Sequence, residues 1–125
     1  KRLFERSQYS FDVNLGFGNA VVSYDRCPKI KPGESIGVNL RIFGRFWAIP
    51  ENLSVRFITP DGFTVSGPRA FYMEAGSMSN DYYPNSSADY VITAGETTEG
   101  LNRIIVEIVC PGRPSVGLFE LILLG

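Results

Sequence analysis

Apolar residues recur at every second position in several short runs of this sequence, and this alternation constrains the fold more than any other feature. The clearest run is SIGVNLRIF at 35–43, whose apolar positions are Ile36, Val38, Leu40 and Ile42. Further runs repeat the spacing at Leu53, Val55 and Phe57, at Phe63 and Val65, and at Ile104, Val106 and Ile108. Successive side chains of a β-strand point to opposite faces of its sheet. The runs therefore predict half-buried antiparallel strands.

Turn-forming residues separate these runs. Pro, which fixes φ, and Gly, which permits positive φ, occur in KPGE at 31–34, TPDG at 59–62, SGPR at 66–69, TAGE at 93–96 and CPGRP at 110–114. No stretch has the apolar spacing of an amphipathic helix. We therefore predict an all-β fold, an immunoglobulin-like antiparallel β-sandwich of about seven to nine strands, with a closed barrel as the alternative.

The expected strands lie near 11–16, 20–25, 35–43, 53–59, 63–66, 70–74, 90–93, 103–109 and 117–124, and the alternative for the first two is one bent strand. A length of 125 residues suits one domain with a single core. We assign residues 11–125 to that domain and residues 1–10 to a linker or leading segment. The chain begins KRLFERSQYS, without an initiator methionine or a signal peptide, so we expect a piece of a longer protein.

Charge and hydropathy argue against two classes of partner. Twelve basic and thirteen acidic residues give a formal net charge of -1, which supplies no field to attract nucleic acid. A membrane-spanning helix needs about 18 consecutive apolar residues. The longest candidate, VGLFELILLG, is interrupted by Glu120. We therefore expect neither nucleic-acid binding nor membrane insertion.

The sequence contains no histidine, which argues against most catalytic and metal-binding arrangements. Histidine is the commonest general base and the commonest metal ligand. No spacing of the carboxylates selects an acid-base pair, and GFG at 16–18 lacks the helix that a nucleotide-binding loop requires, so we interpret it as a bend or bulge. Asn80, Asp81 and Asn85 cluster as calcium ligands would, but these residue types are also frequent in turns. We expect no enzymatic activity, no cofactor and no metal.

The two cysteines, Cys27 and Cys110, are expected to be free thiols. In an immunoglobulin-type strand order Cys27 precedes the strand that begins at Ser35, whereas Cys110 ends the penultimate strand. These positions lie at opposite ends of a sandwich, beyond the roughly 7 Å between Cα atoms that a disulfide tolerates.

The segment AFYMEAGSMSNDYYPNSSADY at 70–90 permits two interpretations. In one, aromatic residues form a stacking platform for sugar rings: Tyr72, Tyr82, Tyr83, Tyr90 and Phe71, with Phe46 and Trp47 from the insertion FGRFWAIPE. In the other, Phe71, Met73 and Tyr90 belong to strands and pack inward, and the residues between them form a loop. Adjacent Tyr82 and Tyr83 would point in opposite directions in an extended backbone, which favours the loop. Trp47 would then anchor the core or a domain interface.

The last predicted strand is apolar on both faces. With Phe119, Leu121 and Leu123 toward the core, Leu118, Ile122 and Leu124 lie on the outer face beside Glu120. Either the N-terminal segment or another domain covers that face, or these are ordinary exposed apolar residues.

The motifs also resemble those of a known group of domains. IKPGESIGVNLRIF, ENLSVRFITPDGFTVSG and ITAGETTEGLNRIIVEIVCPGRPSVGLFELILLG are similar to segments of the immunoglobulin-like and fibronectin-like accessory domains attached to bacterial glycoside hydrolases and surface proteins. The matching residues are Pro32, Gly33, Glu34, Pro60, Asp61, Gly62, Phe63, Pro114, Gly117, Phe119 and Leu121. The resemblance covers residues from Ile30 onward, and FGRFWAIPE and the 70–90 segment depart from it.

This resemblance implies a non-catalytic accessory domain of a larger, bacterial protein that contacts a neighbouring domain. An extracytoplasmic or cell-surface location would fit the same group of domains. The alternative function is a carbohydrate-binding module that uses the aromatic residues of 70–90 and has polysaccharide as its partner.

Overall fold

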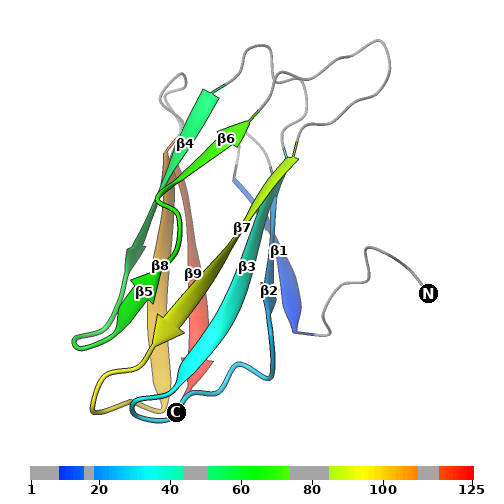
Figure 1. The fold of residues 1–125 in the computed structure, drawn as a ribbon. Helices are drawn as coiled ribbons and strands as arrows, with labels where there is room; N and C mark the ends of the chain where they lie inside the picture. Colours follow the sequence, from blue (N-terminus) through cyan, green and yellow to red (C-terminus); the bar gives the residue numbers. More distant parts are fainter. Residues whose placement is uncertain (1–8, 16–18, 44–50, 74–84, 110–115) are drawn as a thin grey trace.

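The computed structural model describes residues 9–15, 19–43, 51–73, 85–109 and 116–125 (Figure 1). These residues form nine strands, which are β1 (Ser10–Asn14), β2 (Asn19–Tyr24), β3 (Ser35–Phe43), β4 (Glu51–Ile58), β5 (Thr64–Ser66), β6 (Ala70–Met73), β7 (Asn85–Thr93), β8 (Leu101–Val109) and β9 (Val116–Leu124). The described residues include no helix that is long and apolar enough to cross a membrane.

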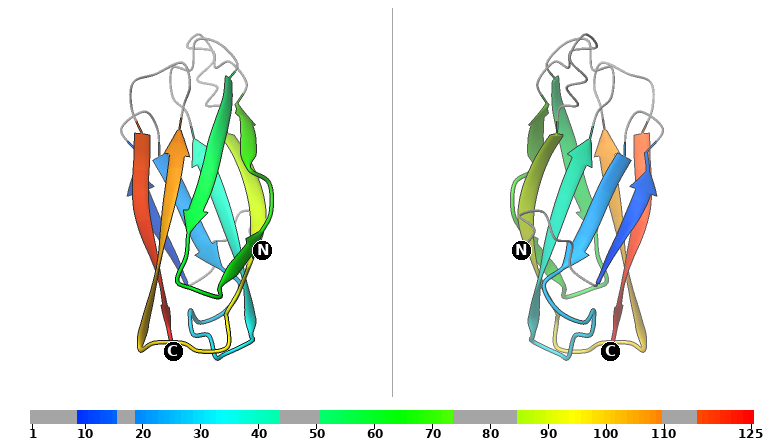
Figure 2. Two further views of the ribbon diagram at one scale, coloured as in Figure 1. Left: turned by 90° about the vertical axis from the view of Figure 1, so that its left-hand side faces the viewer. Right: turned by 90° about the vertical axis from the view of Figure 1, so that its right-hand side faces the viewer.

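The strands form two antiparallel sheets packed face to face (Figures 1 and 2). The five-stranded sheet has the order β1-β2-β3-β7-β5, and the four-stranded sheet has the order β6-β4-β8-β9. The predicted immunoglobulin-like β-sandwich is therefore confirmed. The barrel alternative is wrong, because no ladder between the described strands joins one sheet to the other.

Two details of the strand prediction are wrong. β1 and β2 are not one bent strand, because they run antiparallel with Ser10 opposite Ser23. β7 begins at Asn85, five residues before the predicted start at 90, because the residues from Asn85 onward continue the ladder along β3 as far as Phe43. Their polar, turn-like composition concealed a strand that is specified by its partner.

The core lies between the sheets and is built from the alternating residues identified in the sequence. The alternating apolar residues of β3 are all buried, and so are the inward residues of β8. The first two alternating residues of β4 are buried as well, whereas Phe57 of β4 and Val65 of β5 are half-buried. In β9 Leu121 and Leu123 are buried and Phe119 is half-buried. The outward residues of β9 are exposed, so its predicted alternation is correct.

Gly permits positive φ in the turns at one end of the sandwich. In KPGE the N–H of Glu34 donates to the carbonyl of Lys31 at 3.0 Å, and Gly33 has a φ of 79°. Gly62 has a φ of 84° in the turn that joins β4 to β5. Residues with a side chain rarely adopt such angles. These two glycines therefore allow tight reversals that hold neighbouring strands in register.

Candidate functional site

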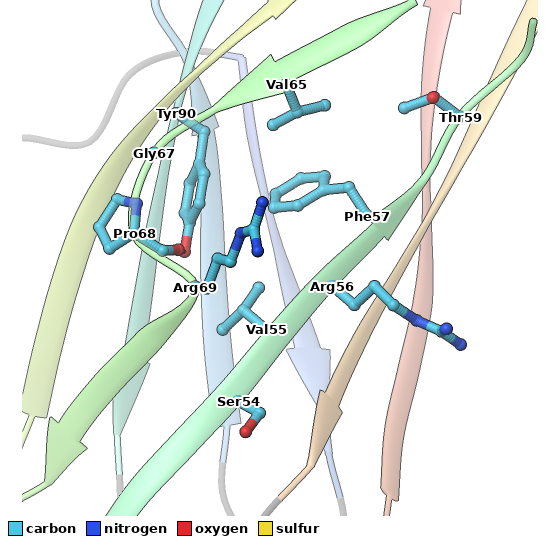
Figure 3. A pocket seen from close by; sticks show the side chains of 10 residues that line it. All are labelled: Ser54, Val55, Arg56, Phe57, Thr59, Val65, Gly67, Pro68, Arg69 and Tyr90. Atoms are coloured by element: carbon cyan, nitrogen blue, oxygen red, sulfur yellow. The ribbon is translucent and has the colours of Figure 1, made fainter.

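A groove of about 510 Å³ opens along one long side of the sandwich, between β4 and the chain that leads from β5 to β6 (Figure 3). Its lining residues are Ser54, Val55, Arg56, Phe57, Thr59, Val65, Gly67, Pro68, Arg69 and Tyr90. Residues from both faces of β4 line it, so the groove runs along the backbone edge of that strand. Its volume is in the range of ligand-binding pockets.

The groove exists because β4 and β5 are consecutive in the chain but belong to different sheets. β4 pairs with β8, whereas β5 pairs with β7. The chain then returns to the four-stranded sheet through Gly67 and Pro68, and the carbonyl of Arg69 accepts a hydrogen bond from the N–H of Val55 at 2.8 Å. Gly67 has a φ of 147°, and a Cβ there would collide with the ring of Tyr90. Only glycine fits this crossing.

Tyr90 forms one wall of the groove. Its ring lies 4.8 Å from the ring of Phe57, centroid to centroid, at an interplanar angle of 50°. Its hydroxyl donates to the carbonyl of Pro68 at 2.6 Å, and burial raises the pKa of Tyr90 to about 12. The tyrosine therefore stays neutral and holds the β5–β6 crossing in place. Val55 and Val65 complete an apolar lining.

Two arginines border the groove and differ in their partners. Arg56 points away from it in Figure 3 and forms an ion pair with Glu107 at 3.1 Å. Arg69 is exposed, and its guanidinium points into the space between Tyr90 and Phe57. Among the described residues no acidic side chain lies within ion-pair distance of Arg69. Arg69 thus places an uncompensated positive charge at an apolar opening.

Of the aromatic residues predicted to form one platform, the structure describes the side chains of Tyr72 and Tyr90. Tyr72 is exposed on β6, with 56% of its surface accessible. Tyr90 is buried at 2%, as in the inward-packing interpretation, so its membership of an exposed platform is wrong. The candidates Tyr82, Tyr83 and Trp47 lie outside the described residues, so the platform itself stays a prediction.

The predicted interface residues Leu118, Ile122 and Leu124 lie on the outer face of the four-stranded sheet, with exposed fractions of 59%, 38% and 40%. Leu101 lies opposite Leu124 in the adjacent strand and is also exposed. Exposed Ile105 and Ile58 form a further cross-strand pair on this face. We call these six residues the outer apolar patch.

Cys27 is a free cysteine with a half-buried side chain. Lys29 bridges to Leu124, and Leu124 lies opposite Leu101 at the start of β8. Val109, which precedes Cys110, is eight residues further along β8, about 26 Å at normal strand rise. The prediction that Cys110 is also free concerns a residue outside those described and stays a prediction.

The described residues contain no cluster of three or more side chains that could hold a metal ion. Of the possible calcium ligands, Asn85 opens β7, and Asn80 and Asp81 lie outside the described residues. The structure therefore assembles no metal site in the part of the chain that it describes.

Sequence reasoning missed the groove. SGPR at 66–69 was interpreted as an ordinary turn, although it carries the chain from one sheet to the other. The available signal was a Gly-Pro pair followed by an arginine between two unusually short strands. That signal does not specify which sheet each strand joins.

Comparison with known proteins supports the fold. No family model and no curated protein matches the sequence. A FixG-related protein from Vibrio parahaemolyticus is similar in structure, with a TM-score of 0.62, 10% identity, and coverage of 90% of this chain and 97% of that one. The GAE domain of GGA2p from Saccharomyces cerevisiae has a TM-score of 0.52, 10% identity, and coverage of 93% and 96%. At this identity the likeness concerns the fold alone.

Proposed function

We propose that this chain is a non-catalytic accessory domain of a larger protein, and that the outer apolar patch packs against a neighbouring domain. The observation that carries the proposal is the asymmetry between the two outer faces in their exposed apolar residues. Figure 2 shows the strands of the four-stranded sheet nearer the viewer in its left view and those of the five-stranded sheet nearer in its right view. The patch gathers six exposed apolar residues on the four-stranded sheet, whereas on the five-stranded sheet Val91 is the large apolar residue that is exposed among those whose side chains the structure describes.

The polar residues around the patch suit a contact between domains. Arg103 and Glu120 form an ion pair at 3.4 Å beside Ile122, and Arg56 pairs with Glu107 beside Leu118. Interfaces between domains are more polar than obligate subunit interfaces, and they mix apolar side chains with charged ones. On β8 and β9 the apolar residues of the patch alternate with charged ones, as such a contact requires.

The chemistry of the chain supports the non-catalytic part of the proposal. The sequence has no histidine to act as a general base. The carboxylates of Glu107 and Glu120 are engaged by arginines on an open sheet face. The resemblance of the PGE, PDGF and PSVGLFEL motifs to bacterial accessory domains points in the same direction.

Hydrogen exchange in the isolated domain and in the longer protein tests the proposal. We expect the amides of β9 to exchange more slowly in the longer protein, because a neighbour covers the outer face of the strand. A Leu118→Ser/Ile122→Ser double variant should lose that protection. The matched control, Val91→Ser, changes an exposed apolar residue on the other sheet and should keep it. Equal exchange of β9 in both contexts would contradict the proposal.

The exposure of Tyr72 supports carbohydrate binding as a second candidate function. Aromatic side chains provide flat apolar surfaces with a polar tip. Titration of a panel of oligosaccharides and soluble polysaccharides, followed by intrinsic fluorescence, tests this candidate. A saturable change that is lost in Tyr72→Ala and in Tyr82→Ala/Tyr83→Ala would support it. A response that persists in all three variants would exclude these tyrosines as the binding surface.

A further inference from the structure

The backbone edge of β4 is left unpaired where it borders the groove. The ladder with β6 ends at Ser54 opposite Ala70, and Val55 then donates to Arg69. Backbone groups of alternate residues point to the same edge of a strand. The carbonyl of Val55 and both backbone groups of Phe57 therefore point into the groove, and no described segment pairs with them.

The facing edge of β5 is also unpaired. The N–H of Ala94 donates to the carbonyl of Glu34, which lies in the segment before β3. The backbone groups of every second residue of β7 therefore point toward β3, and those of the residues between them point toward β5. Thr64 lies opposite Thr93, and Ser66 lies opposite Val91. The backbone groups of Thr93 and Val91 point toward β5, so the backbone groups of Thr64 and Ser66 are hydrogen-bonded to β7. The N–H and C=O of Val65 then point away from β7, toward the groove. Phe57 and Val65 thus present backbone groups from the two sides of one opening.

β4 and β5 form a hairpin whose two strands separate beyond the turn, with Phe57 on one strand and Val65 and Ser66 on the other. The Oγ1 of Thr59 donates to the carbonyl of Phe63 near the turn, as in a narrow hairpin. Beyond that point the two strands enter different sheets. Unpaired strand edges are templates for another extended chain, which binds through main-chain hydrogen bonds while its alternate side chains enter pockets.

We infer that the groove between β4 and β5 binds an extended peptide segment of a partner protein, with one apolar side chain directed into the cavity and a carboxylate two residues away, on the same face of the peptide, paired with Arg69. The apolar side chain would contact Phe57, Val65 and Tyr90, which line the interior. The carboxylate follows from charge complementarity, since Arg69 has no acidic partner among the described residues. This surface is separate from the outer apolar patch.

The occupant follows from the combination of features. An apolar small molecule would leave the backbone groups of Phe57 and Val65 without partners, and unsatisfied backbone groups are costly. A lone anion would pair with the guanidinium of Arg69 but would leave the apolar cavity unfilled. An extended peptide with alternating side chains satisfies the backbone edges, the cavity and the charge together.

Titration with short peptides, followed by amide NMR spectroscopy on the whole chain, tests the inference. The probe is the acetylated, amidated peptide Ser-Thr-Val-Thr-Glu-Thr-Val-Ser, in which Glu shares one face with the two Val residues. One control peptide has Lys in place of Glu, and a second carries N-methyl groups on alternate residues, which remove the strand hydrogen bonds. The variants are Arg69→Glu and the control Arg103→Gln, whose side chain lies outside the groove and pairs with Glu120.

The expected result is saturable shifts confined to residues 54–69 and to Tyr90, with slower exchange of the Phe57 and Val65 amides. Arg69→Glu should weaken binding about fivefold, the effect of a charge contact worth about 1 kcal/mol, and Arg103→Gln should leave it unchanged. The inference is overturned if the Lys or N-methyl peptide binds as well as the probe, if the shifts fall elsewhere, or if no peptide shifts any amide at millimolar concentration. Shifts that reflect dimerisation in sedimentation would also overturn it, since the occupant would be a second copy.

Discussion

The two long sides of this sandwich are closed to different degrees. On the side where β9 is the edge, the segment before β3 bonds to the strand: Ile30 donates to the carbonyl of Leu124 at 2.8 Å, and Leu124 donates to Pro28 at 2.9 Å. The hydroxyl of Tyr24 reaches the carbonyl of Ile122 at 3.5 Å. On the side of β4 and β5, a groove of about 510 Å³ separates two strand edges.

The difference arises from the lengths of the two connections that run along these sides. The connection from β2 to β3 is long enough to place residues 28–30 against β9 before it enters the five-stranded sheet. The crossing from β5 to β6 has only Gly67, Pro68 and Arg69, which cannot fill the gap that they span. The short connection thus leaves backbone groups available, and the longer one covers backbone groups of β9.

The largest expected effect is at the crossing beside the groove. Gly67→Ala should destabilise the domain by about 2 to 4 kcal/mol, because the residue has a φ that side chains rarely adopt and the new Cβ meets the ring of Tyr90. Urea denaturation measures the change. Gly100→Ala is the matched control, since nothing lies within 4 Å of a Cβ at that position. An unchanged midpoint for Gly67→Ala would mean that Gly67 does not hold the crossing against Tyr90.

The side of the sandwich where β9 is the edge depends on the buried side-chain amide of Asn102, which lies on β8 and bonds to the end of β9. Asn102 is 1% exposed, and its Nδ2 donates to the carbonyls of Leu123 at 2.9 Å and Glu99 at 3.0 Å, while its Oδ1 accepts from the N–H of Glu99. Asn102→Ala should cost about 2 kcal/mol, because buried backbone groups lose their partners. We also expect faster exchange of the neighbouring Ile30 amide.

Denaturation and hydrogen exchange check this prediction together. Asn52→Ala is the control, because Asn52 is exposed on β4 and should have a small effect. A loss of stability without faster exchange at Ile30 would show that Asn102 supports its own loop but not the closed side.

The sequence predicted the strands, the inward residues and the two faces of β9, because these depend on local alternation and turn chemistry. Ile36 and Leu121, for example, are buried as the two-residue period requires. The early start of β7 and the burial of Tyr90 depend on pairing with β3 and packing against Phe57. The groove was beyond local reasoning, because it depends on two consecutive strands joining different sheets.

The two sides can finally be compared through one tyrosine on each. Burial raises the pKa of Tyr24 on the closed side, and it raises the pKa of Tyr90 beside the groove to about 12. The unfolded chain releases the Tyr90 proton near pH 10, whereas the folded domain retains it to higher pH. The contribution of Tyr90 to stability is therefore complete below pH 10 and is lost as pH rises toward 12.

At pH 11 this loss amounts to about 1 kcal/mol, since the folded state still holds a proton that the unfolded state has released. Tyr90→Phe, which cannot ionise, should show a correspondingly smaller decrease between pH 9 and pH 11 in urea denaturation. Tyr24→Phe is the matched variant on the closed side. If Tyr90→Phe follows the wild-type pH dependence, the hydroxyl of Tyr90 is not held against Pro68, and the wall of the groove is looser than the hydrogen bond implies.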